Sequence, residues 1–339
     1  MISLGSHSLR NTVALAPMAG VTDVPFRQLA WRLGVGYMVG EMTGSRPELR
    51  HTRKTLLRRE AVAGALHAIQ IAGTDPLWIA DATRDAIDCG AAIVDINFGC
   101  PAKKVCRKAA GSALMEHPDQ LIELAAAAVA AASERDAIVT VKMRTGPTDA
   151  NRNAPELAGR LQDVGVMALS IHGRTRACKF NGSAEYDTIA TVKSRITIPL
   201  FANGDIETPT DAQRVIDHTG ADGVMIGRAA LGAPWLPAWI AAGIEGRSYV
   251  LPDIGQRLEW LMEQLLATHA FYGVDQGARI ARKHIQWTLS HKTLASKDSI
   301  ELDEDARESL ARLSNTLLRA PSAAAQLDLL AHACERRAA

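Results

Sequence analysis

The chain has 339 residues, of which 47% are hydrophobic and 22% charged, and its formal net charge is +1. This composition is typical of a globular protein and excludes a largely disordered chain, while the balanced charge excludes a uniformly basic surface. The five cysteines are odd in number and lack zinc-type pairing, so we expect a reducing compartment and no structural metal. The N-terminal residues lack a signal-peptide pattern and no apolar run is long enough to span a bilayer, which predicts a cytoplasmic protein without membrane contact.

Eight short apolar segments alternate with amphipathic ones along the first two thirds of the chain. The apolar segments, which we interpret as strands, are residues 13–16, 37–39, 66–71, 93–97, 138–142, 168–172, 199–203 and 223–227. Helix signals cover residues 75–90, 118–132, 155–165, 208–220 and 229–243. This alternation predicts an α/β fold, a (β/α)8 TIM barrel. Residues 2–9, which turn at Gly5-Ser6, predict a small hairpin that plugs the barrel bottom.

At the end of each predicted strand, the apolar pattern gives way to polar or catalytic residue types. These endings include Glu41, Gln70 and residues 142–144, 172–174 and 203–205. The active site of a TIM barrel lies at the carboxyl ends of its strands, because the loops that follow them surround one mouth. The eight endings therefore predict a single active site.

Two glycines follow the seventh and eighth strands, where such barrels commonly bind phosphate. Gly204 and Gly227 would let backbone N–H groups approach phosphate oxygens, and Arg228 adds a guanidinium. Ordinary turn glycines are the alternative. Because both glycines occur at matching places, we predict a phosphate site here.

Residues 95–104 follow the fourth strand and bring together a thiol, a carboxamide and several cations. Gly99 removes a side chain beside Cys100, and Pro101 fixes φ behind it, so the thiol would occupy a defined place on its loop. A buried structural cysteine is the alternative, since free cysteine is among the most buried residue types. The other strand endings favour a reactive thiol.

Strand-like segments stop after residue 243, and helical periodicity covers residues 254–271, 277–289, 303–318 and 322–336. We therefore predict a barrel domain of residues 1–243 and a helical bundle domain of residues 244–339. Arg279, Arg282, Lys283 and Gln286 share one face of the second of these helices. A solvated polar face explains this spacing as well as a nucleic-acid contact does.

Several of these segments resemble the tRNA-dihydrouridine synthase family, most of all its bacterial B-type branch. The resemblance is densest over residues 95–112, where Asn97-Phe98-Gly99-Cys100-Pro101 is followed by Gly111-Ser112. It runs from about residue 10 to residue 290, through segments 16–23, 40–42, 70–73, 142–146, 171–176, 202–206 and 227–229. The departures are Gly40, Phe98 and Cys106, where the family often has Ser, Met and a polar residue. None of them removes a group that the family's chemistry requires.

The resemblance implies a cofactor, FMN, held in the barrel mouth and reduced by NADPH. The residues that would hold the FMN phosphate are Asn203, Gly204, Asp205, Gly227 and Arg228. The flavin ring would rest on Pro17, Met18 and Ala19, and its polar edge would face Gln70 and Lys142. His172 would make a further contact near the phosphate, with a core histidine as the alternative.

The resemblance also implies a reaction, the reduction of the C5=C6 bond of a uridine in tRNA to 5,6-dihydrouridine. Hydride from flavin N5 would reach C6, and Cys100 would protonate C5, since a thiol is mostly protonated at neutral pH. The residues predicted to contact the substrate are Asn97, Lys108, Arg144, Arg279, Arg282 and Lys283. The target nucleotide would be extruded into the mouth, and residues 103–108 and 279–284 would grip the tRNA backbone. We expect the enzyme to act as a monomer.

Two other functions stay open at this point. An FMN barrel that reduces a free pyrimidine, as dihydropyrimidine or dihydroorotate dehydrogenases do, has a similar cysteine loop but predicts no RNA-binding domain. A non-catalytic RNA-binding protein on a barrel scaffold predicts a colourless preparation.

Overall fold

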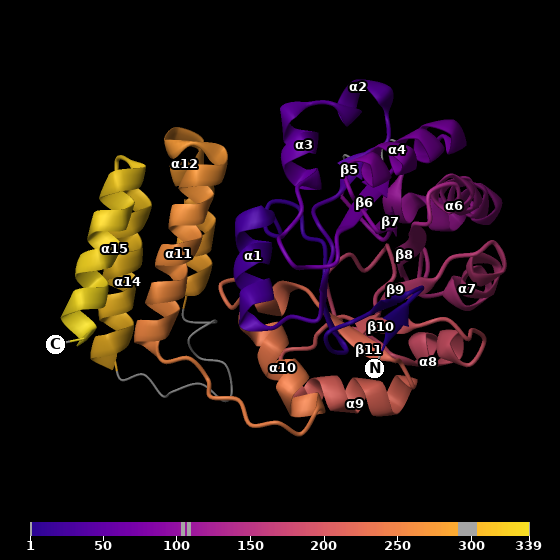
Figure 1. The fold of residues 1–339 in the computed structure, drawn as a ribbon. Coiled ribbons are helices and arrows are strands. Elements are labelled where there is room, and N and C mark those ends of the chain that lie inside the picture. Colours follow the sequence, from indigo (N-terminus) through magenta and orange to yellow (C-terminus); the bar gives the residue numbers. More distant parts are fainter. Residues whose placement is uncertain (1, 103–105, 107–109, 291–303, 339) are drawn as a thin grey trace.

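The computed structural model describes residues 2–102, 106, 110–290 and 304–338. Parallel strands form a barrel surrounded by helices, and the last helices stand together on one side of it (Figure 1). The predicted TIM barrel is confirmed, as is the run of helices that follows it.

Within the described residues, nine parallel strands form one sheet in the order β4-β3-β11-β10-β9-β8-β7-β6-β5. The strands are β3 (Val13–Leu15), β4 (Tyr37–Met38), β5 (Thr43–Gly44), β6 (Ala68–Ala72), β7 (Ile93–Phe98), β8 (Ile138–Arg144), β9 (Ala168–His172), β10 (Leu200–Asn203) and β11 (Gly223–Ile226). The extra strand arises because the second barrel strand is divided. β4 pairs with β3 and β5 pairs with β6, and the N–H of Gly40 between them donates to the carbonyl of Ala68 (3.3 Å). The sequence predicted one strand here and missed β5.

Most of the helices that surround the barrel begin at capping residues or prolines, and α8 is an exception. They are α1 (Val24–Leu33), α2 (Pro47–Arg50), α3 (Arg53–Arg59), α4 (Pro76–Asp88), α6 (Pro118–Ser133), α7 (Ala154–Asp163), α8 (Asp187–Lys193), α9 (Pro209–Thr219) and α10 (Leu236–Ile244), with short 3-10 helices η1 (Gly111–Glu116) and η2 (Arg228–Ala230). The helix predicted over residues 229–243 is wrong in its first half. Gly232 has a positive φ of 71°, and Pro234 follows, so the chain turns before α10 begins.

One end of the barrel is closed by apolar side chains. The predicted hairpin is present as β1 (Ser3–Leu4) and β2 (His7–Ser8). Leu4 of β1 and the preceding Ile2 join a buried cluster with Ile93 and Phe201 inside the barrel. The polar strand endings therefore lie at the opposite, open end.

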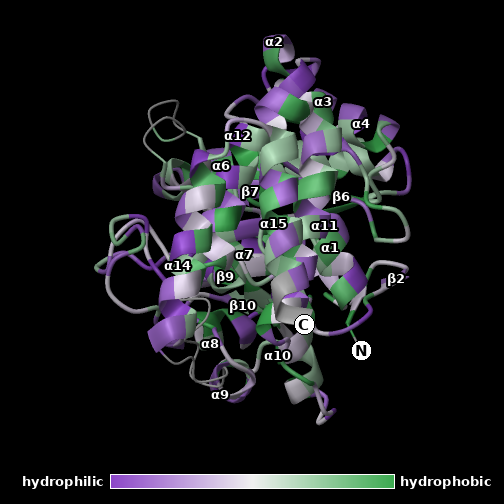
Figure 2. Ribbon diagram, turned by 90° about the vertical axis from the view of Figure 1, so that its left-hand side faces the viewer, coloured by the Kyte–Doolittle hydropathy of each residue, from purple (hydrophilic) through white to green (hydrophobic). Residues whose placement is uncertain are grey.

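Four helices, α11 (Ile254–Tyr272), α12 (Val274–Thr288), α14 (Glu304–Arg319) and α15 (Ala323–Ala338), bury an apolar cluster of their own. Figure 2 faces these helices and shows hydrophilic and hydrophobic residues alternating along α14 and α15. Contacts to the barrel are made by α11 and α12. The hydroxyl of Tyr272 donates to Asp23 Oδ2 (3.1 Å), and the rings of His284 and Phe26 stack with centroids 5.9 Å apart.

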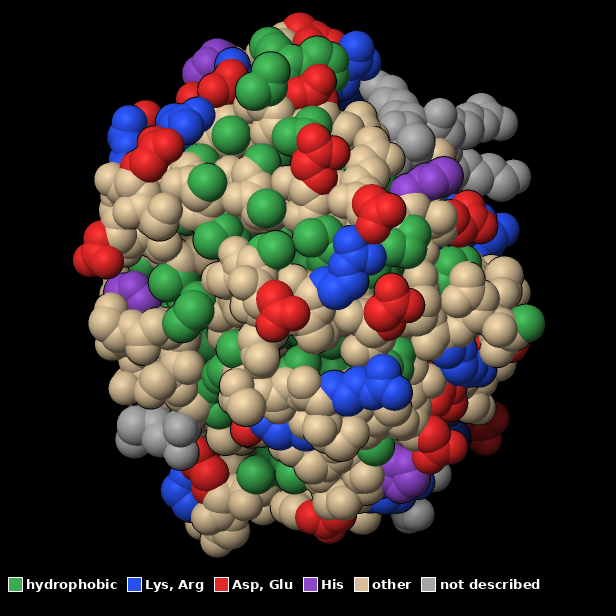
Figure 3. Space-filling model, turned by 90° about the vertical axis from the view of Figure 1, so that its right-hand side faces the viewer, with side chains coloured by type: hydrophobic (Ala, Val, Ile, Leu, Met, Phe, Trp, Pro, Cys, Tyr) green, Lys and Arg blue, Asp and Glu red, His purple; other side chains and the backbone are tan. Residues whose placement is uncertain are grey.

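The outer face of the barrel helices carries acidic and basic side chains scattered among apolar ones (Figure 3). In the described part of the chain, no helix combines the length and apolar character needed to cross a membrane.

Candidate active site

A cavity of about 1040 Å³ opens at the carboxyl ends of the barrel strands. It brings together all the residues predicted to hold the cofactor, namely Pro17, Met18, Ala19, Gln70, Lys142, His172, Asn203, Gly204, Asp205, Gly227 and Arg228. Three further predicted residues, Asn97, Cys100 and Arg144, also line it. Arg279, Arg282 and Lys283 belong to α12 and are not among the residues that line it. Lys108 and the cluster 103–108, apart from Cys106, lie outside the described residues.

Lys142 is held at the floor of the cavity by an asparagine from a neighbouring part of the barrel. Its Nζ donates to Asn203 Oδ1 (3.0 Å), and Asn203 Nδ2 donates to the carbonyl of Met225 (2.7 Å). Burial, and then the charge of Arg144, lower the pKa of Lys142 to about 8. At neutral pH the cavity floor therefore still carries an ammonium, and the amide of Asn203 is used to orient it.

The loop of Cys100 is fixed on three sides. Asn97 Oδ1 accepts from the backbone N–H groups of Gly99 (3.2 Å) and Cys100 (2.9 Å). Arg144 Nε donates to the carbonyl of Gly99 (2.8 Å), and Ser112 Oγ donates to the carbonyl of Cys100 (2.9 Å). Burial raises the pKa of the Cys100 thiol above its ordinary value, although nearby cations oppose this. The thiol is therefore protonated at neutral pH.

Arg144, predicted to contact the substrate, makes several hydrogen bonds within the protein itself. Besides Gly99, its guanidinium donates to the carbonyls of Thr175 (3.0 Å) and Lys179 (2.7 Å), and the side chain is 1% exposed. It therefore joins the loops after β7 and β9, and its positive charge stays beside the cavity.

Two further arginines, Arg174 and Arg228, line one side of the cavity. Arg174, which is 3% exposed, forms a bidentate ion pair with Asp205 (2.9 and 2.6 Å), and Arg228 lies 3.5 Å from the same carboxylate. Burial opposes the charge of Asp205, but the hydrogen bonds from Arg174 and the Ala184 N–H, together with the charges of Arg174 and Arg228, outweigh it and lower the pKa of Asp205. Two guanidiniums against one carboxylate leave this side positive. In the sequence, Arg174 is recognisable only as part of a strand ending, and we did not predict it as a site residue.

His172 is neutral, because burial and the surrounding cations lower its pKa far below the ordinary value. Arg174 Nη1 lies 3.3 Å from His172 Nε2. Since arginine can only donate, Nε2 accepts and the proton of the ring is on Nδ1.

The position of Gly204 requires a glycine. Its φ is +122°, and a Cβ there would stand 2.9 Å from the Cβ of Ala184.

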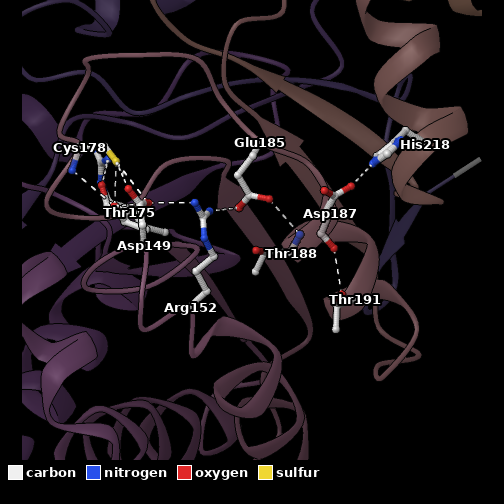
Figure 4. A network of polar contacts seen from close by, with 10 residues as sticks. Asp149, Arg152, Thr175, Cys178, Glu185, Asp187, Thr188, Thr191 and His218 are labelled. Atoms are coloured by element: carbon white, nitrogen blue, oxygen red, sulfur yellow. Dashed lines mark hydrogen bonds and ion pairs between the residues drawn. The ribbon is translucent and has the colours of Figure 1, made fainter.

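The loops after β8 and β9 are tied together beside the cavity (Figure 4). Arg152 donates to Asp149 (2.9 Å) and to Glu185, and Glu185 in turn accepts from the backbone N–H of Thr188 (3.0 Å) at the start of α8. The loop fixed in this way carries Phe180, whose ring lies 5.2 Å from the guanidinium carbons of both Arg144 and Arg228. The arrangement holds an aromatic ring over the positive side of the cavity.

The predicted basic face of α12 is divided by the structure. Arg279 and Arg282 are exposed, whereas Lys283 is partly buried against the barrel. Its Nζ would lie 3.4 Å from a Cβ placed on Gly20, and burial lowers its pKa despite the nearby carboxylates of Asp23 and Glu41. Lys283 therefore faces the barrel loop that carries Pro17 to Ala19.

A family model described as dihydrouridine synthase (Dus) matches residues 14–322 of this chain. The chain belongs to this family. Among curated relatives, tRNA-dihydrouridine synthase B of Salmonella typhimurium is 44% identical over 314 residues, which cover 91% of this chain and 97% of that protein. The protein of the same name from Pasteurella multocida is 45% identical over 289 residues, covering 84% and 86%. The resemblance to the B-type branch is confirmed.

Several solved structures resemble the barrel of this dihydrouridine synthase at low sequence identity. Histamine dehydrogenase from Rhizobium sp. 4-9 aligns with a TM-score of 0.54 and 12% identity, covering 78% of this chain and 50% of that chain. Morphinone reductase in complex with tetrahydroNAD aligns with a TM-score of 0.52 and 17% identity, covering 75% and 92%. At these identities the likeness concerns the fold alone.

Proposed function

We propose that this protein is a tRNA-dihydrouridine synthase, an FMN-dependent oxidoreductase that uses NADPH to convert a uridine in tRNA to 5,6-dihydrouridine. The observation that carries this proposal is the position of Cys100 and Lys142 in one cavity at the barrel mouth, in a chain of the dihydrouridine synthase family. We further propose that it works in the cytoplasm, because its cysteines are free, as in a reducing compartment. We propose a monomer, because one chain carries both the cavity and a helix with exposed basic residues.

The residues around the cavity suit the three parts of FMN. Arg174 and Arg228 supply positive charge for a phosphate, and the backbone at Gly204 and Gly227 lines the same side. Residues 16–19 offer an apolar seat for a ring. Lys142 would face its polar edge, where an ammonium favours negative charge. When bound and reduced, FMN supplies the hydride that is added to C6 of the uracil.

Cys100 acts as the general acid. Its raised pKa keeps the proton on Sγ at neutral pH, and transfer of that proton to C5 leaves a thiolate. The positive charges of Arg144 and Lys142 stand near enough to favour that thiolate as it forms. Asn97 keeps the thiol in place through the N–H groups of its loop.

The tRNA would lie across the cavity mouth and α12. Arg279 and Arg282 are exposed and suited to phosphate contacts, while Lys283 faces the barrel and is left out of this assignment. Asn97 and Arg144 lie close enough to the thiol to border an extruded uracil.

The test is mass spectrometry of tRNA after incubation with the purified protein, FMN and NADPH. A gain of two hydrogens, mapped to a uridine, is the expected result. A yellow protein that reduces free uracil or a free dihydropyrimidine precursor but leaves tRNA unchanged would contradict the tRNA assignment, and a protein that binds no flavin would contradict the reaction itself.

A further inference from the structure

Asp95 is an acidic residue inside the barrel for which the proposed chemistry has no use. It lies on β7, is 3% exposed and does not line the cavity. Burial raises the pKa of its carboxyl, against the effect of the hydrogen bonds that it accepts. The hydrogen bonds to its two oxygens offset only part of the cost of burying this carboxyl group, so its place here calls for a function.

Asp95 stands at the start of a chain of hydrogen bonds that ends at the Cys100 loop. Its Oδ2 accepts from Gln70 Nε2 (2.7 Å), and Gln70 Oε1 accepts from Asn97 Nδ2 (2.8 Å). Asn97 Oδ1 then accepts from the N–H groups of Cys100 (2.9 Å) and Gly99 (3.2 Å). Strand pairing sets the first step, because Gln70 and Asp95 are register partners across β6 and β7.

The series of hydrogen bonds from the Cys100 loop to Asp95 can run in only one direction. A side-chain amide has a donating end and an accepting end, so turning one amide forces the next to turn. The N–H groups of Gly99 and Cys100 can only donate, and they therefore require the oxygen of Asn97. In that orientation Asn97 Nδ2 donates to Gln70, whose oxygen must therefore accept. The Nε2 of Gln70 then points toward Asp95. A hydrogen-bond acceptor at position 95 therefore stabilises the observed orientations of both Gln70 and Asn97.

We propose that Asp95 is a positioning residue, which fixes the orientation of Gln70 and Asn97 and thereby holds the loop of the Cys100 thiol. The inference rests on the proposed function for its catalytic consequence, but the orientation of the two amides is set by hydrogen bonds within the protein itself. Gln70 also lines the cavity, and this orientation leaves its remaining amide hydrogen, a donor, for a ligand.

Thr140 provides a way to test the direction of these hydrogen bonds separately from the charge of Asp95. Its Oγ1 donates to Asp95 Oδ1 (2.7 Å), and a hydroxyl can also accept. In Asp95→Asn the new amide can give its NH2 to Thr140 and keep its oxygen toward Gln70, so the chain survives without the charge. In Asp95→Asn combined with Thr140→Val, that NH2 loses the Thr140 hydroxyl as its partner. The amide then leaves one polar end unsatisfied whichever way it faces, so it no longer fixes the orientation of Gln70, and the hold on the Cys100 loop weakens.

The experiment compares four proteins: wild type, Asp95→Asn, Thr140→Val and the double variant. The first measurement is the alkylation rate of Cys100 by iodoacetamide in cofactor-free protein, mapped by mass spectrometry, with Cys178 as an internal reference. The second is kcat for dihydrouridine formation. Both single variants should stay close to wild type. The double variant should show several-fold faster alkylation of Cys100 and a kcat lower by roughly 100-fold, the loss typical of a misplaced reacting group.

Two results would overturn the proposal. If Asp95→Asn alone shows the full loss, the charge matters and the direction does not; if the double variant matches the single ones, the chain does not hold the loop. Adding Thr140→Ser to Asp95→Asn restores the hydroxyl and should recover wild-type behaviour. Should the double variant not fold, Asp95→Leu, which removes the acceptor, is predicted to show the same two changes. A wild-type protein without activity on tRNA would defeat the proposed function, while the alkylation rates would still decide the orientation.

Discussion

Replacing Lys142 with methionine should change how the stability of the cofactor-free protein depends on pH. A lysine in an unfolded chain has a pKa of about 10.4, whereas Lys142 in the folded chain has one of about 8. This difference corresponds to about 3 kcal/mol of free energy that opposes folding at pH 7. The cost is fully present below pH 8, where both states bind the proton. It falls as the pH rises from 8 to about 10.4, because the unfolded state then binds more protons than the folded one.

The assay is urea denaturation of cofactor-free wild type and Lys142→Met at pH 7 and pH 9.5. Wild type should gain about 2 kcal/mol relative to the variant between these pH values, since one proton difference contributes about 1.4 kcal/mol per pH unit. Comparing the two proteins cancels the titration of every other group that is unaffected by the change. Parallel pH profiles for the two proteins would refute the reasoning, because Lys142 would then not be a cation that the fold tolerates at a cost. Turnover should be lost in Lys142→Met at both pH values.

Further expectations concern the thiol, the phosphate side and the tRNA. Cys100→Ala should bind FMN as tightly as wild type, yet form product about 10²- to 10⁴-fold more slowly; undiminished single-turnover rates would remove the thiol from the mechanism. Gly204→Ala should lower the unfolding free energy by about 2 to 4 kcal/mol, through its positive φ and the contact with Ala184. Its control, Gly159→Ala in α7, meets nothing within 4 Å and should raise that free energy by about 0.5 to 1 kcal/mol, so equal urea midpoints for the two would be unexpected. Affinity for tRNA should fall steeply with salt, and Arg279→Ala or Arg282→Ala should each reduce the slope by about one, a change that a filter-binding titration would detect.

The barrel could be predicted because its strands are short apolar runs between clear helix signals. The ranges for β9, α4 and α6 differ from the sequence expectation by no more than two residues at either end. The divided second strand was missed because β5 has only two residues, Thr43–Gly44, and no apolar alternation. Helix α10 was predicted to begin too early because the Ala-rich sequence before it reads as helical, and only the positive φ of Gly232 shows the turn.

The members of the cavity were predicted better than their contacts. Strand endings indicate which residues reach the mouth of a barrel, since this follows from the direction of the strands alone. Partners depend on side-chain directions across several loops, which no local pattern contains. Arg174 is an example: its bidentate pairing with Asp205 joins two loops that are 31 residues apart. Lys283 is another, because helical spacing placed it with Arg279 while packing turned it toward the barrel.

The two groups proposed to do chemistry are each held by an asparagine. Asn97 holds the loop of Cys100, and Asn203 holds Lys142; both asparagines stand near the carboxyl ends of their strands. Each amide is itself fixed at its other end, by Gln70 in the first case and by the carbonyl of Met225 in the second. An amide is suited to this task because its donor and acceptor are rigidly opposed, so that fixing one end directs the other. The thiol and the ammonium are thus oriented before any ligand enters, which reduces the reorganisation required when the reaction occurs.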